Sequence, residues 1–136
     1  MVRKAKIPRL AVDAVILTKD KKVLLVKRKF KPFKDFYALP GGFVEYGEKV
    51  EDACVREAFE ETGLKVKIVR LLGVYSDPKR DPRFHNVSIA FICKRVGGSL
   101  KDSKETYDVR FFSNSELKKI KLAFDHKKIL NDAGII

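Results

Sequence analysis

The sequence has few cysteines, and their placement limits what the protein can be. Its 136 residues include two, Cys54 and Cys93, which form neither a CxxC pair nor a Cys/His cluster. Because each lies inside an apolar periodic segment, we expect buried thiols in a reducing compartment, not metal ligands or a disulfide framework. The sequence therefore predicts a cytoplasmic protein.

Long apolar runs are also absent. No stretch approaches the roughly 18 consecutive apolar residues that indicate a membrane-spanning helix. The first ten residues, MVRKAKIPRL, are basic but contain no apolar core and no small-residue cleavage site, so a secretory signal is not expected. We therefore expect no membrane partner.

Thermolabile residues are scarce as well. There is no glutamine, one methionine and three asparagines, while 35% of the residues are charged, which is typical of thermophile proteins. Hydrophobic residues make up 45% of the chain, enough to form a core at this length. Since no linker, repeat or low-complexity tract divides residues 1–136, we expect a single domain.

The chain is basic, with a formal net charge of +12, but the charge is unevenly distributed. Residues 1–40 contain 12 Lys and Arg against 3 Asp and Glu, whereas residues 41–64 contain 2 against 7. An acidic segment in a basic protein predicts carboxylates that bind a cation and a basic surround that attracts a polyanion. That polyanion is a nucleic acid or a small phosphorylated metabolite, and lysines that serve only solubility are the alternative.

Hydrophobic periodicity and turn residues predict strands that alternate with about three helices. This order indicates an α/β or α+β domain in which helices cover a mixed sheet. The expected elements are a hairpin of strands 11–18 and 22–28, a helix over 50–62 ended by Gly63, strands 65–75, 86–96 and 107–112, a short helix reaching 120 and capped by Ser113 or Ser115, and a final helix over 124–133 with Asp125 near its start.

Three glutamates fall on one face of the helix expected over 50–62. Glu57, Glu60 and Glu61 stand at i, i+3 and i+4. Like charges this close repel one another, and a bound divalent cation removes the conflict; oxygen ligands suit Mg²⁺ or Mn²⁺. Taken alone, the motif also fits glutamates on a solvated helix face.

The wider spacing is more specific. Gly42 is followed after five residues by Glu48, and after seven more by the run REAFEETGL over 56–64. This stretch resembles the Nudix box, G-x5-E-x7-R-E-U-x-E-E-x-G-U, in which U is aliphatic. Every fixed position matches, and Ala58 is smaller than the usual aliphatic residue. The resemblance implies an α/β/α sandwich with a mixed sheet and a loop–helix–loop catalytic motif.

The resemblance also implies a reaction, the hydrolysis of a nucleoside diphosphate linked to another moiety. It implies Glu57 and Glu61 as the principal metal ligands, with Glu60 contributing directly or through water and the Gly41 carbonyl as a further ligand. A divalent cation can neutralise phosphate charge and activate water.

Other residues of the box and its surroundings have implied supporting roles. Arg56 would orient the glutamates through ion pairs, and Glu48 would support that network or a second metal. Glu105 stands before a late strand, where several relatives have the general base. Glu61 or Glu60 could activate the water instead, and an ordinary loop position for Glu105 is an equal alternative.

Residues 77–88, DPKRDPRFHNVS, carry the cue to the substrate. Pro78 lies 15 residues beyond Gly63, and the run resembles Nudix enzymes that act on ADP-ribose, with Phe84 where glycine is expected. Two prolines would stiffen a loop that presents arginines, whose guanidinium groups suit pyrophosphate. A rigid solvated turn is the alternative. The approach to the box, with Tyr37 where tryptophan is typical, and the run LAFDH over 122–126 resemble the same subgroup. The candidate substrate-binding residues are Arg28, Tyr37, Arg80, Arg83 and His85.

The sequence thus predicts a Mg²⁺-dependent Nudix hydrolase that converts ADP-ribose to AMP and ribose 5-phosphate. Alternatives are oxidised nucleoside triphosphates, diadenosine polyphosphates, NADH, RNA 5′ ends, and a sensor that binds ADP-ribose without cleaving it. The basic surface keeps nucleic acid open, although no RNP-like or KH-type motif supports it. Relatives in this subgroup are often homodimers, and the basic N-terminus (Arg3, Lys4, Lys6, Arg9) would be a dimer arm, a phosphate-attracting surface or a frayed tail.

Overall fold

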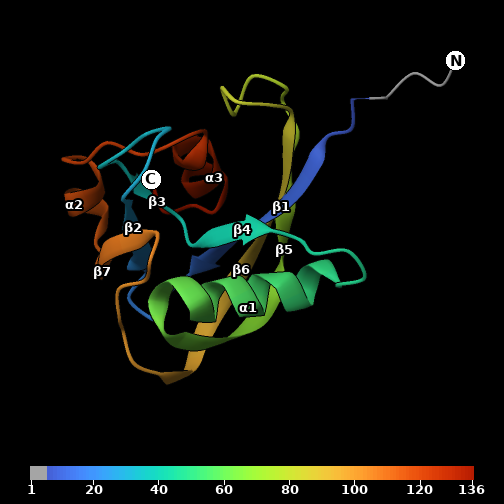
Figure 1. The fold of residues 1–136 in the computed structure, drawn as a ribbon. Coiled ribbons are helices and arrows are strands. Elements are labelled where there is room, and N and C mark those ends of the chain that lie inside the picture. The colour runs from blue at the N-terminus through green and yellow to red at the C-terminus, as the bar shows by residue number, and fades with distance from the viewer. Residues whose placement is uncertain (1–5) are drawn as a thin grey trace, which may run out of the picture.

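Seven strands form two β-sheets in the computed structural model, which describes residues 6–136. The larger sheet has the strand order β4-β1-β6-β5 and the smaller one the order β3-β2-β7. The strands are β1 (Arg9–Ile16), β2 (Val23–Arg28), β3 (Tyr37–Ala38), β4 (Gly41–Phe43), β5 (Leu64–Tyr75), β6 (Asn86–Gly98) and β7 (Thr106–Phe112), and the helices are α1 (Val50–Thr62), α2 (Asn114–Leu117) and α3 (His126–Asp132). Figure 1 shows α1 lying across one side of the larger sheet, with α3 on the opposite side.

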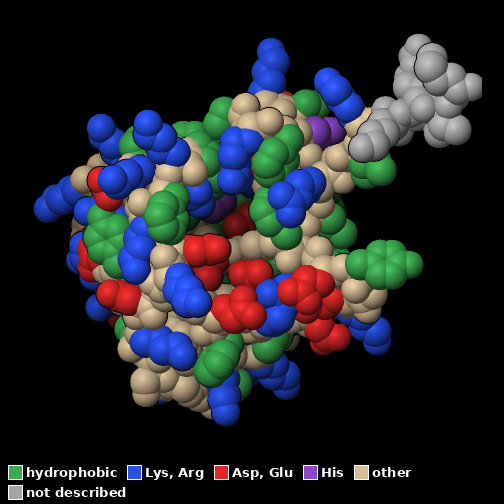
Figure 2. All heavy atoms as spheres, in the orientation of Figure 1, with side chains coloured by type: hydrophobic (Ala, Val, Ile, Leu, Met, Phe, Trp, Pro, Cys, Tyr) green, Lys and Arg blue, Asp and Glu red, His purple; other side chains and the backbone are tan. Residues whose placement is uncertain are grey.

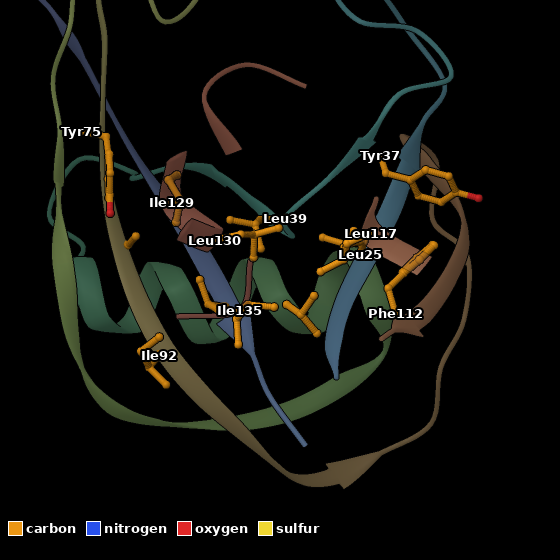
Figure 3. Packing of buried hydrophobic residues seen from close by; sticks show 13 residues of the cluster. Leu25, Tyr37, Leu39, Tyr75, Ile92, Phe112, Leu117, Ile129, Leu130 and Ile135 are labelled. Carbon is orange, nitrogen blue, oxygen red and sulfur yellow. The ribbon is translucent and has the colours of Figure 1, made fainter. Parts of the chain in front are cut away.

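Alternation along β1 divides the core into two layers. Val12, Ala14 and Ile16 pack with Cys54 and Ala58 of α1 in one buried cluster. Successive strand residues point to opposite faces, and Val15 accordingly belongs to a second cluster between the sheets. In that cluster Ile129 and Leu130 of α3 point toward Ile92 of β6 and Leu25 of β2 (Figure 3). The α/β/α sandwich that the sequence predicted is confirmed.

The hairpin expected over 11–18 and 22–28 does not form, although both strands exist. β1 pairs antiparallel with β4 and parallel with β6, whereas β2 pairs with β3 and β7. One isolated bridge, Leu17 with Val23, joins the two ends. Since both faces of β1 are buried, it becomes an inner strand with a partner on each edge, and β2 passes into the other sheet.

The helix predicted over 50–62 is confirmed at both ends. Gly63 has a left-handed φ of 81°, and its N–H donates to the Phe59 carbonyl, which ends α1 as a glycine cap does. Ser113 caps α2 with a capping box, and the helix ends at Leu117 and not at 120. The last helix spans His126–Asp132 and not 124–133; Asp125 is its N-cap residue, but its carboxylate pairs with Arg80 and makes no side-chain cap. Cys54 and Cys93 are buried and free, as expected.

The basic N-terminus is described only in part. Arg3 and Lys4 of the basic N-terminus lie outside the described residues. Arg9 begins β1, and its guanidinium stacks 3.5 Å from the centre of the Phe43 ring. Across residues 6–136 the longest helix has 13 residues, and none is long and apolar enough to span a membrane.

Candidate active site

A cleft of about 460 Å³ opens beside the C-terminal half of α1. Its wall includes carboxylates from α1 and from the loop before β7, together with guanidinium groups from β2 and from the 76–85 loop. Figure 2 shows acidic side chains gathered above and along α1, with lysines and arginines around them. Both negative and positive side chains therefore line the cleft.

The helix presents its glutamates to the cleft at graded depths. Glu61 is 8% exposed and the Glu57 side chain is 15% exposed, whereas the Glu60 side chain is 56% exposed. Glu57 and Glu61 line the cleft, while Glu60 is outside the lining and accepts from Arg56. The structure thus brings Glu57 and Glu61 together in the cleft, both desolvated, and leaves Glu60 exposed beside them.

Burial governs the electrostatics of the deeper pair. Desolvation raises the pKa of Glu61 well above its ordinary value, and the charge of Glu57 raises it further. Desolvation likewise raises the pKa of Glu57, against the hydrogen bond that it accepts from Arg56. Two neighbouring carboxylates held away from water favour a cation or a proton between them.

Two glycines allow this close approach. The Gly41 N–H donates to Glu61 Oε1 over 3.2 Å, which ties β4 to α1. At Gly42 a Cβ atom would lie 2.5 Å from Glu57 Oε2 and 2.6 Å from Oε1. Any side chain there would therefore displace the Glu57 carboxylate, so Gly42 is required by space and not by its φ angle.

Arg56 organises the outer carboxylates. Its Nε donates to Glu48 Oε2 over 2.8 Å and its Nη2 to Glu48 Oε1 over 2.9 Å. Its Nη1 donates to Glu57 over 2.8 Å and to Glu60 over 3.2 Å. The hydrogen bonds from Arg56 lower the pKa of Glu48 to about 2. The structure thus gives Arg56 and Glu48 the arrangement that the resemblance implied.

The donor set fits a divalent cation, although the protein alone does not complete a site. Within the described chain no Lys, Arg or His forms an ion pair with Glu61, so its desolvated charge has no protein cation. Carboxylate and carbonyl oxygens are the ligands that Mg²⁺ and Mn²⁺ prefer. Nevertheless, residues 6–136 contain no group of three or more His, Cys, Asp or Glu arranged to hold a metal. Further ligands would come from water or substrate.

Glu105 lines the cleft near the end of α1, since the neighbouring Thr106 hydroxyl donates to the Glu61 carbonyl. It is exposed in the loop just before β7, and its charge contributes to the raised pKa of both Glu57 and Glu61. Its backbone is held, since its carbonyl accepts from Lys29 N–H and its N–H donates to Ser103. A fixed, solvated carboxylate near the α1 glutamates can accept a proton.

Two of the predicted arginines reach the cleft with guanidinium groups that suit phosphate. Arg28 and Arg83 flank Phe124, at 4.9 Å and 5.9 Å from its ring centre. Burial lowers the pKa of Arg28, and the charge of Arg83 adds to this effect, which indicates that the two cations lie close together. Two adjacent cations in a cleft favour a polyanion.

Arg80 is placed differently from the sequence expectation. It is 8% exposed and pairs bidentately with Asp125, over 2.9 Å and 2.7 Å. Arg83 also pairs bidentately, with Asp81, but its side chain is 39% exposed whereas that of Arg80 is 3% exposed. A buried guanidinium with both arms on one carboxylate has little left to offer a phosphate. Although Arg80 borders the cleft, its contacts tie the 76–85 loop to the start of α3.

Tyr37 and His85 are not brought to the cleft. The Tyr37 ring packs edge-on against Phe112 in the core, and its hydroxyl donates to Asp108. His85 Nε2 lies 2.9 Å from the Ser76 carbonyl, so it closes its own loop. The expectation that these two contact substrate therefore has no support in the geometry, because Asp108 holds the Tyr37 hydroxyl and the Ser76 carbonyl holds His85 Nε2.

Two buried polar residues line the cleft, of which the sequence indicated His126, in the run LAFDH, and missed Asp13. Asp13 is 7% exposed and His126 is 3% exposed, and both line the cavity. Burial lowers the pKa of His126, which favours the neutral ring. An aspartate inside the apolar run AVDAVILT was the available signal, because an unpaired charge is costly in a buried strand.

A glutamate-bearing loop–helix–loop set into a cleft of an α/β/α sandwich defines a Nudix-type hydrolase. The NUDIX domain family matches residues 7–133, and the chain belongs to that family. It is 56% identical over 125 residues to the ADP-ribose pyrophosphatase of Methanocaldococcus jannaschii, a match that covers 92% of this chain and 72% of that protein.

Solved structures with bound nucleotides are similar to this one. The Nudix domain of Shewanella oneidensis NrtR, solved with ADP-ribose, has a TM-score of 0.82 at 27% identity and is matched over 96% of this chain and 88% of its own. The bifunctional NMN adenylyltransferase/ADP-ribose pyrophosphatase of Francisella tularensis, solved with AMP and a manganese ion, has a TM-score of 0.80 at 28% identity. The match covers 95% of this chain and 42% of the Francisella chain.

Proposed function

We propose that this Nudix hydrolase cleaves ADP-ribose to AMP and ribose 5-phosphate with the aid of Mg²⁺, for which Mn²⁺ substitutes. The observation that supports this proposal most directly is the cleft, which is lined by the desolvated Glu57 and Glu61 and by the guanidinium groups of Arg28 and Arg83. The similarity to the ADP-ribose pyrophosphatase of Methanocaldococcus and the ADP-ribose in the Shewanella structure support the substrate. Residues 1–136 act in this proposal as one cytoplasmic domain.

Glu57 and Glu61 would hold the cation, with help from Glu60 and the Gly41 carbonyl. When bound, the cation neutralises pyrophosphate charge and lowers the pKa of water. Arg56 keeps Glu57 and Glu60 in place through its hydrogen bonds, and Glu48 fixes Arg56 in turn.

Arg28, Arg83 and Glu105 carry out the remaining steps. Arg28 and Arg83 bind the pyrophosphate oxygens and orient the chain of phosphates in the cleft. Glu105 accepts a proton from the attacking water as the water oxygen bonds to phosphorus. The bridging P–O bond then breaks, and its electron pair leaves with the second phosphate. In-line displacement of this kind depends on positioning and on charge neutralisation.

A nucleotide panel tests the proposal. We expect AMP release from ADP-ribose in Mg²⁺ at elevated temperature, loss of that release in EDTA, and slower turnover of nucleoside triphosphates, diadenosine polyphosphates, NADH and capped RNA. Faster turnover of another nucleotide would keep the hydrolase and reject the substrate. Tight binding of ADP-ribose in Mg²⁺ without turnover would favour the sensor, and sedimentation of the same sample tests the expected homodimer.

Replacing Arg83 with alanine should raise KM for ADP-ribose about tenfold and change kcat little. Its side chain is 39% exposed, so its loss removes a binding contact at the cleft, but it also removes the ion pair with the buried Asp81 over 2.8 Å. The thermal midpoint of the variant is therefore measured, and its rates are compared well below that midpoint. Steady-state kinetics check this, with Arg95→Ala as the matched control, since Arg95 is exposed on β6 and outside the cleft. An unchanged KM in Arg83→Ala would remove Arg83 from the binding site.

A further inference from the structure

The segment that leads from β3 into β4 is held by two side chains. Pro40 has no N–H, so the donors on either side of it belong to Leu39 and Gly41. The Leu39 N–H donates to His126 Nδ1 over 3.0 Å, and the Gly41 N–H donates to Glu61 Oε1 over 3.2 Å. The segment is therefore hydrogen-bonded to α3 through His126 and to α1 through Glu61.

The tautomer of His126 follows from these contacts. Because Nδ1 accepts a hydrogen bond from the backbone, the neutral ring carries its proton on Nε2. Nε2 lies 3.4 Å from Asp13 Oδ1, and the other oxygen of Asp13 accepts from Ser88. A buried carboxylate on β1 thus orients the ring, and the ring in turn orients Leu39.

The same carboxylate also bounds Gly41. β1 and β4 pair with Asp13 opposite Gly41, and a Cβ on Gly41 would lie 2.6 Å from Asp13 Oδ1. The Gly41 backbone therefore fits between Asp13 and Glu61 with no room to spare. Between Leu39 and Gly41 the Pro40 carbonyl accepts from Ala14 N–H over 2.8 Å, so residues 39–41 are held as one short unit. A shift of Leu39 would therefore disturb the hydrogen bond from Gly41 to Glu61.

From these contacts we propose that His126 is a positioning residue for the hydrolysis, in which Nδ1 fixes Leu39 so that Gly41 meets Glu61. The inference rests on the proposed function, because its effect on rate is felt through Glu61. α3 thereby takes part in the reaction indirectly, through His126.

Two substitutions distinguish the roles of the two ring nitrogens of His126. Asparagine places an oxygen near the position of Nδ1 and can still accept from Leu39 N–H, whereas glutamine places its amide near Nε2 and leaves that N–H unpaired. We expect His126→Gln to lower kcat for ADP-ribose about tenfold with KM nearly unchanged, and His126→Asn to lower it less than threefold. Lys127→Gln, at the exposed neighbouring position on α3, is the control.

A second readout needs no substrate. Amide hydrogen exchange at Gly41 and Leu39, followed by NMR, should quicken in His126→Gln and stay close to wild type in His126→Asn. Both variants lose ring packing, so their thermal midpoints are measured and all rates compared well below them. Equal losses of kcat and protection in the two variants, or none in either, would overturn the proposal. Absence of ADP-ribose turnover in the wild type would reject the proposed function, while exchange at Gly41 would still decide the role of His126.

Discussion

Replacing Glu61 with glutamine is expected to lower ADP-ribose turnover about a thousandfold and to raise the thermal midpoint. Glu61 is buried beside Glu57, and no protein cation pairs with it in the described chain. The amide removes a desolvated charge and can still accept from Gly41 N–H, so the folded state gains stability. Loss of the charge also removes the principal site for a cation.

The gain in stability should depend on pH in a defined direction. Because burial raises the pKa of Glu61, the folded protein binds a proton more tightly there than the unfolded chain does. The contribution of protonated Glu61 to the stability of the fold is then fully present below the pKa of the unfolded state, about 4.3. It is lost as pH rises through the raised pKa of the folded state. In EDTA the midpoints of Glu61→Gln and wild type should be close at pH 4, and the variant should be higher at pH 7.

Calorimetry with and without Mg²⁺ completes this test. The cation should raise the midpoint of the wild type through binding to the folded state and should have a much smaller effect on Glu61→Gln. Glu51→Gln, at an exposed position in the first turn of α1, is the matched control and should behave as wild type. Wild-type turnover in Glu61→Gln would reject the assignment of the site to this helix.

Local features of the site were predictable because they depend on neighbouring residues. The helix over 50–62 follows from its apolar spacing and from Gly63, and the common face of Glu57, Glu60 and Glu61 follows from helical geometry. Once the box spacing is recognised, the partners of Arg56 are also predictable, because all of its carboxylates lie within the same stretch.

Features set by distant partners were not predictable from the sequence. Arg80 carries a group suited to phosphate, yet Asp125, 45 residues away, takes both of its arms. Tyr37 stands in a motif position, yet Asp108 and Phe112 hold it in the core. The hairpin failed for the same reason, since the burial of both faces of β1 depends on strands that come later in the chain.

Replacing Arg56 with lysine is expected to lower kcat about a hundredfold and to lower the thermal midpoint, although the charge is kept. The guanidinium donates at once to Glu48, Glu57, Glu60 and the Phe43 carbonyl. A single ammonium group cannot reproduce that fork of donors. Glu57 and Glu60 would then lose their fixed positions, and the like charges along α1 would be only partly compensated.

The acid side of the stability profile distinguishes this loss from a general weakening. Arg56 lowers the pKa of Glu48 to about 2, so the pair stabilises the fold above the unfolded pKa near roughly 4.3, and that contribution is lost as pH falls toward 2. The midpoint of Arg56→Lys should therefore lie well below wild type at pH 6 and approach it near pH 2.5. Glu48→Gln should show the same convergence, because it removes the same pair. A constant difference at every pH would mean that Arg56 acts through packing and not through Glu48.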